Sequence, residues 1–188
     1  MLGQAARKPR ADGERNRALL LDAAKAAFAE AGTDVPLEDI ARRAGVGIGT
    51  LYRHFPTRGA IVTAVYQHEV AQLADAAERL LKTRPAGAAL HAWMRLFVDY
   101  IATKKVVAAA LEASGTDLRA VSGARITGAM ELLVERARAA GDIRADADPD
   151  DLLRALVGFT YGNTSLGWQA SALRLIDVLM DGLRAERR

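Results

Sequence analysis

Apolar residues recur every three or four positions along most of the chain, and this spacing predicts amphipathic helices. One such stripe consists of Leu20, Ala24, Ala27 and Phe28. Proline, glycine and capping residues separate the stripes, and no segment shows the strict alternation of a strand. The sequence therefore predicts an all-α protein of about nine helices, over residues 13–31, 37–44, 48–55, 57–82, 86–103, 104–113, 118–140, 149–163 and 169–184.

Residues 33–58 contain the most informative part of this pattern. Two short predicted helices, 37–44 and 48–55, are separated by Gly45 and Val46. Glycine adopts the positive φ that a tight turn needs, and the valine side chain can fill the angle between the helices. The spacing predicts a helix-turn-helix, a motif that seats its second helix in the major groove of DNA.

The second of these helices should bury Leu51 and Phe55, which lie four residues apart, and turn its other side chains outward. Gly47 and Gly49 leave room for a close approach to base edges. A plain helical hairpin is the alternative for the whole stretch, and ordinary surface packing is the alternative for its aromatic and basic side chains. The glycines argue against the hairpin, because glycine lowers helix stability without improving the packing.

Composition excludes several functional classes. The 188 residues include no cysteine, which rules out disulfides, thiolate zinc sites and cysteine nucleophiles. The three histidines lack metal-ligand spacing, and no strand precedes a glycine-rich phosphate loop. The chain also lacks a signal-peptide pattern and an apolar run of membrane-spanning length. We therefore expect a cytoplasmic protein with no catalytic activity, no metal and no cofactor.

The net charge of +3 lies entirely in the third of the chain that contains the predicted helix-turn-helix. Residues 1–60 carry 10 Lys and Arg against 7 Asp and Glu, whereas residues 61–188 carry 16 against 16. Neutralisation of phosphates supplies most of the non-specific affinity for DNA, so the excess is where a DNA-binding domain needs it. Residues 1–12 are predicted to form a flexible basic arm, either touching DNA or merely solvated.

The same stretch resembles the signature of the TetR/AcrR family of bacterial repressors. The matching residues are Ile40-Ala41, Ala44-Gly45-Val46 and Gly49-Thr50-Leu51-Tyr52-Arg53-His54-Phe55, with further matches in residues 20–32. The resemblance is specific over residues 15–65, and the rest of the chain matches only as a helical pattern of suitable length. It implies a homodimeric repressor that binds a palindromic operator in double-stranded DNA and is released by an unknown small-molecule effector.

The resemblance also assigns the DNA contacts. It implies base contacts from Gly47, Ile48, Gly49, Thr50 and Arg53, and phosphate contacts from Tyr52, His54 and Arg58. Since Arg53 is the only long hydrogen-bond donor on the base-facing side, we expect it to read guanine. The chain departs from the family at two places. At residues 35–37, Val-Pro-Leu replaces the hydroxyl residue that usually opens the helix predicted over 37–44, and at position 58 lysine is commoner in the family.

For the remaining two thirds, the resemblance implies a ligand pocket and a dimer interface. The candidate pocket residues are Trp93, Met94, Phe97, Met130, Leu133 and Phe159. The candidate interface residues are Leu152, Leu156, Phe159, Ala172, Ile176, Leu179 and Leu183. Packing within one chain is the alternative for both sets. The expected organisation is therefore a basic arm over 1–12, a DNA-binding domain over 13–60, and a ligand-binding and dimerisation domain over 61–188.

A hypothesis of a different class also fits the pattern, namely a helical protein–protein interaction module whose helix-turn-helix does not bind DNA. The two hypotheses differ in their dependence on salt. Binding to DNA should weaken steeply as salt is added, whereas binding through an apolar surface should not.

Overall fold

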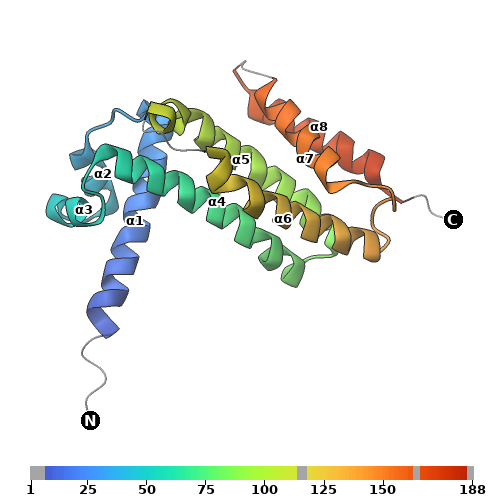
Figure 1. The fold of residues 1–188 in the computed structure, drawn as a ribbon, viewed down its shortest axis with the longest axis horizontal. Coiled ribbons are helices and arrows are strands. Elements are labelled where there is room, and N and C mark those ends of the chain that lie inside the picture. Colours follow the sequence, from blue (N-terminus) through green and yellow to red (C-terminus); the bar gives the residue numbers. More distant parts are fainter. Residues whose placement is uncertain (1–6, 114–117, 163–165, 186–188) are drawn as a thin grey trace, which may run out of the picture. The chain divides into compact units, whose positions relative to one another are not determined.

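The computed structural model describes residues 7–113, 118–162 and 166–185 (Figure 1). These residues form eight helices: α1 (Arg7–Ala31), α2 (Leu37–Ala44), α3 (Ile48–His54), α4 (Arg58–Thr83), α5 (Ala86–Ala113), α6 (Leu118–Ala139), α7 (Pro149–Tyr161) and α8 (Trp168–Leu183). The predicted all-α class is confirmed. Among the described residues, no helix combines the length and apolar character that crossing a membrane requires.

The helices differ from the prediction at two places. Helix α1 begins at Arg7, so residues 7–12 continue the first helix where we expected a flexible arm, and residues 1–6 lie outside the described ranges. Pro9 is compatible with this start, because the N–H groups of a first helical turn have no intrahelical partner. The predicted break after Thr103 is absent, and α5 runs on to Ala113, since no glycine or proline interrupts it there.

The chain divides into two compact units. The first contains α1, α2 and α3, together with α4 as far as His68 and the end of α5 from Thr103. The second contains the rest of α4 and α5 and all of α6, α7 and α8. Two long helices, α4 and α5, therefore contribute to both units.

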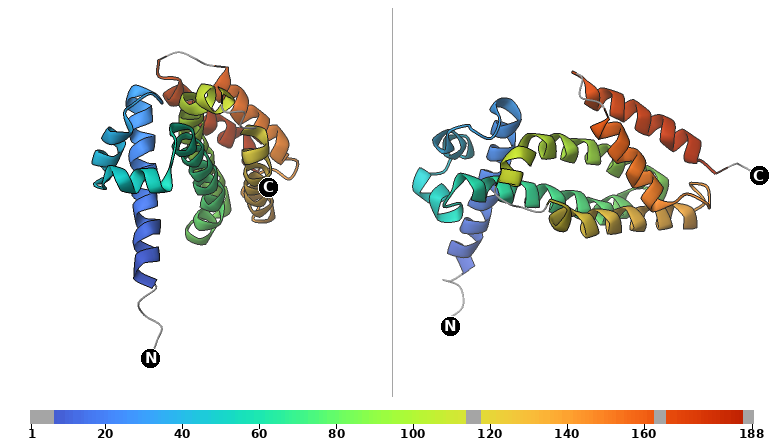
Figure 2. Two further views of the ribbon diagram at one scale, coloured as in Figure 1. Left: turned by 60° about the vertical axis from the view of Figure 1, so that its left-hand side comes forward. Right: turned by 45° about the horizontal axis from the view of Figure 1, so that its top comes forward.

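The first unit is built around α1, against which α2 and α3 both pack (Figure 2). The apolar stripe predicted for α1 is buried, as are apolar side chains of the helix-turn-helix and of the part of α4 that belongs to this unit. The largest of these buried side chains are Leu20, Leu21, Phe28, Ile40, Leu51, Phe55, Ile61 and Tyr66. The core of this unit therefore fixes the position of the inner face of α3.

The second unit has its own core, centred on α5. Trp93 is fully buried, and its indole Nε1 donates a hydrogen bond of 2.8 Å to the carbonyl of Leu73 in α4. Helix α7 packs against both α6 and α8. The backbone N–H of Arg144 donates to the carbonyl of Leu183 at 2.8 Å, so the segment that follows α6 is joined to the end of α8.

The start of α7 allows a simple test of local stability. The Asp148 side chain caps the helix by accepting a hydrogen bond of 2.9 Å from the N–H of Asp151, and Pro149 occupies the first helical position. We expect Asp148→Ala to lower the free energy of unfolding by about 1 kcal/mol, and Asp148→Asn to lower it much less, because asparagine retains the acceptor. Urea unfolding of both variants measures the difference, and equal losses would contradict a capping role.

Candidate nucleic-acid interface

The turn between α2 and α3 has the geometry that the sequence predicts. Gly45 ends α2 with φ 68° and ψ 26°, in the left-handed region that glycine adopts at little cost. The N–H of Gly45 donates to the carbonyl of Arg42, and the N–H of Val46 donates to that of Ala41 at 3.0 Å. The turn therefore satisfies the last carbonyls of α2 and directs the chain into α3 within a few residues.

The two faces of α3 differ in exposure. Leu51 and Phe55, at its inner side, are 0% and 2% exposed. A Cβ atom added at Gly47 or Gly49 would meet nothing within 4 Å, so the start of the helix is open. Ile48 is 38% and Tyr52 is 45% exposed on the outer side, where Arg53 is exposed as well. The glycines and these three side chains leave a thin, accessible helix start with longer side chains behind it.

Two residues of this outer face are joined by a hydrogen bond. The Nη2 group of Arg53 donates to the hydroxyl oxygen of Thr50 at 3.0 Å, one helical turn away. The hydroxyl of Thr50 can still donate its own hydrogen. Thr50 thus holds the guanidinium of Arg53 along the helix surface.

Cations from neighbouring helices lie beside α3. The guanidinium carbon of Arg17, in α1, is 5.4 Å from the ring centroid of Phe55, and this cation–π contact places a positive charge at the end of α3. No local sequence pattern marks Arg17 as part of this site, since its partner Phe55 lies 38 residues further along the chain. Arg42 and Arg43 are paired with Asp39 and Glu30, at 2.6 Å and 2.7 Å.

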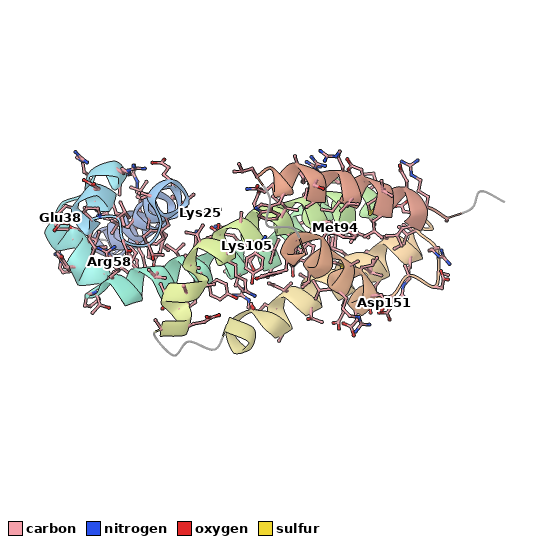
Figure 3. The ribbon with its side chains drawn as sticks, turned by 90° about the horizontal axis from the view of Figure 1, so that it is seen from above. Lys25, Glu38, Arg58, Met94, Lys105 and Asp151 are labelled. Carbon is pink, nitrogen blue, oxygen red and sulfur yellow. The ribbon has the colours of Figure 1, made fainter. Side chains whose placement is uncertain are left out.

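Arg58, the first residue of α4, occupies a different setting from the other basic candidates (Figure 3). Its Nη1 group donates to the carbonyls of Thr33 and Val35, both at 2.6 Å, and its side chain is half-buried. The preceding residue, Thr57, caps α4 by accepting from the N–H of Ala60 at 3.1 Å. The structure therefore brings Arg58 onto the loop before α2.

The candidate ligand-binding residues lie in the interior of the second unit. Trp93, Met94, Phe97, Met130 and Leu133 are buried, and Phe159 is half-buried. The rings of Trp93 and Phe97 are 6.0 Å apart. An open surface cavity of about 730 Å³ in the same unit is lined by other residues, among them His91, Asp142 and Asp177. No local sequence pattern marks this cavity, since its lining residues come from three distant segments.

The candidate dimer residues on α7 and α8 mostly face inward. Leu152, Leu156, Ala172, Ile176 and Leu183 are buried within the protomer itself, and Phe159 and Leu179 are half-buried. The same two helices carry other apolar side chains that are exposed, namely Val157, Tyr161, Leu175 and Val178. The solvent-exposed face of the α7–α8 pair, here called the outer face, therefore combines these four apolar side chains with charged ones such as Arg154 and Arg174.

Comparison with known proteins agrees with this arrangement. Residues 20–65 match the model of bacterial regulatory proteins of the tetR family, and residues 84–185 match the C-terminal domain of SbtR-like transcriptional regulators. A TetR transcriptional regulator from Streptomyces coelicolor has 44% sequence identity and a TM-score of 0.84, over 91% of this chain and 99% of its own.

Two further relatives are more distant. LfrR, a TetR-like regulator from Mycobacterium smegmatis solved in complex with proflavine, is 26% identical, with a TM-score of 0.61 over 90% of this chain and 94% of its own. An HTH-type transcriptional regulator from Staphylococcus aureus is 37% identical over 70 residues, which are 36% of this chain and 36% of that protein. The C-terminal family model spans more than half of the chain. The chain therefore belongs to the TetR family of bacterial transcriptional regulators, and it is a DNA-binding regulator rather than an enzyme.

Proposed function

We propose that this protein is a repressor that binds a palindromic operator as a homodimer and leaves it when a small molecule binds. The observation that carries the proposal is the outer face of α3. Its open glycines allow the helix to approach base edges, and Ile48, Tyr52 and Arg53 are exposed next to them. Since its target would be the bacterial chromosome, we expect the protein to act in the cytoplasm.

Dimerisation follows from the need for affinity, because one helix-turn-helix contacts only one half-site. We assign the interface to the exposed apolar residues of α7 and α8, which are Val157, Tyr161, Leu175 and Val178. The residues first selected from the sequence are mostly committed to the core of the protomer. If a two-fold axis passed through the outer face, these four side chains would be buried against the same four side chains of the second protomer.

The effector is proposed to bind within the second unit. The aromatic and methionine side chains gathered there could line an apolar pocket, which is the usual character of small-molecule sites. The relative from Mycobacterium smegmatis was solved with proflavine bound, which supports a planar aromatic compound as a first probe.

Selection from random duplex DNA tests the proposal directly. The purified protein is incubated with the library at two salt concentrations, and the bound sequences are recovered. A palindrome whose recovery falls at high salt would support the operator-binding dimer and would define the half-site spacing. Failure to bind any duplex even at low salt would contradict it and would favour the protein–protein interaction module.

Two substitutions on α3 should separate base reading from backbone binding. Arg53→Ala is expected to lower discrimination at one base pair of each half-site by about 1–3 kcal/mol, because a bidentate contact to guanine would be lost. Tyr52→Ala is expected to weaken binding to all duplexes alike, since a phosphate contact carries no sequence information. Competition binding against operators with single base changes measures both effects. Unchanged operator affinity in both variants would remove this face from the DNA site.

A further inference from the structure

Arg58 is the residue whose surroundings differ most from its expected role. A phosphate ligand must offer guanidinium N–H groups to the DNA backbone. The Nη1 group of Arg58, which carries two of the five guanidinium N–H donors, already donates in the free protein to the carbonyl oxygens of Thr33 and Val35, each at 2.6 Å. Hydrogen bonds from a charged donor are stronger than neutral ones, and the side chain is half-buried, which limits competition from water.

Among the described residues, the start of α2 has no capping hydrogen bond from a side chain. Helix α2 begins after Pro36, which makes no capping hydrogen bond through its side chain. The residues preferred at this position, serine, threonine, aspartate and asparagine, would tie the helix start to its own first turn through a side-chain oxygen. Here the loop carbonyls on either side of Asp34 are fixed from outside, by a residue 23 to 25 positions later in the chain.

This contact bears on DNA binding through α2. The start of α2 is packed into the first unit by Val35, Leu37 and Ile40, which are all buried. The end of α2 leads through the Gly45 turn directly into α3. A shift of the loop before α2 would therefore tilt α2 and change the direction in which α3 presents its outer face.

We propose that Arg58 is a positioning residue, which clamps the start of α4 to the loop before α2 and so fixes the orientation of α3. It contributes to DNA affinity by preorganisation, not by contact with a phosphate. This role in DNA affinity rests on the proposed function, because the clamp would matter for affinity only if α3 is presented to an operator. The clamp itself is a property of the free protein and can be tested without DNA.

The first test replaces Arg58 with glutamine and measures operator binding as a function of salt. We expect affinity to fall about tenfold with an unchanged slope of log K against log salt, because no phosphate contact is lost. A phosphate ligand would instead reduce the slope by about 0.9 for each contact removed. Arg79→Gln, which removes the same charge from an exposed site in the second unit, is the matched control for net charge.

Amide hydrogen exchange of the same variant shows which part of the backbone is loosened when the Arg58 contacts are lost. Amides of residues 33–41 are expected to exchange at least tenfold faster in Arg58→Gln, while the cores of both units keep their protection. Faster exchange throughout the molecule, with normal affinity of the folded fraction, would mean a merely structural role and would overturn the proposal.

A measurement on the unaltered protein covers the case in which the variant does not fold. With arginine side chains labelled with nitrogen-15, the guanidinium hydrogens of Arg58 are expected to be protected before DNA is added and to shift little on binding. Signals that are averaged in the free protein and become protected only on operator DNA would show a phosphate ligand instead. If the wild-type protein binds no DNA, the proposed function fails, but the exchange results on free protein still decide whether the clamp exists.

Discussion

Replacing Val178 with glutamate is expected to convert the proposed dimer into monomers and to lower operator affinity more than about 100-fold. Val178 is 67% exposed in the protomer, so the substitution should change the stability of the protomer itself by no more than about 0.5 kcal/mol. In the proposed symmetric interface, however, the two new carboxylates would be buried without partners. Unpaired buried charges cost several kcal/mol, and about 2.8 kcal/mol already corresponds to a factor of 100.

The measurement is sedimentation equilibrium together with operator titration. Ala139→Glu is the matched control, because it adds the same charge at an exposed position of α6 in the same unit. We expect this control to remain dimeric. A Val178→Glu protein that is still a dimer with normal operator affinity would show that the outer face of α7 and α8 is not the interface.

Replacing Trp93 with alanine is expected to lower the free energy of unfolding by about 3–5 kcal/mol, as large-to-small changes of buried aromatic residues do. The side chain is 0% exposed, and its loss also leaves the carbonyl of Leu73 without the hydrogen bond from Nε1. Domains of this kind are stable by only about 5–15 kcal/mol, so the variant should unfold at a markedly lower denaturant concentration.

This substitution also tests whether the candidate pocket residues line a binding site. Trp93→Phe keeps most of the buried volume but not the N–H, so it should lie between the wild type and Trp93→Ala in urea unfolding. A loss below about 1 kcal/mol for Trp93→Ala would mean that the site already contains open space, as a ligand pocket would. A large loss would assign Trp93 to the permanent core and move the search for the effector site elsewhere in the second unit.

Local features account for what the sequence predicted well. The bounds of α2 follow from Pro36 before the helix and Gly45 after it, and α7 starts where Asp148 and Pro149 require. These signals act within one helical turn, so neighbouring residues are enough to read them. The expected break in α5 had no such signal, since two adjacent lysines do not stop a helix.

The inner and outer faces of α3 were also determined by the sequence. Leu51 and Phe55 lie four residues apart, and helical periodicity alone puts both on one side. Because α3 is short and packs through this one side, its remaining residues are left exposed. The structure accordingly leaves the candidate base-reading residues exposed or half-buried, as that periodicity requires; they are Gly47, Ile48, Gly49, Thr50 and Arg53.

Long-range contacts were decided only by the tertiary structure. Periodicity marks Leu156 and Ile176 as apolar, but it does not say whether an apolar stripe packs within the protomer or against a second copy, because both burials use the same residue types. The contacts of Arg58 with Thr33 and Val35 depend on how three helices converge on one loop. The sequence by itself determined the fold class, the family and the helix-turn-helix, whereas burial and the partners of the charged side chains depend on packing between residues far apart in the chain.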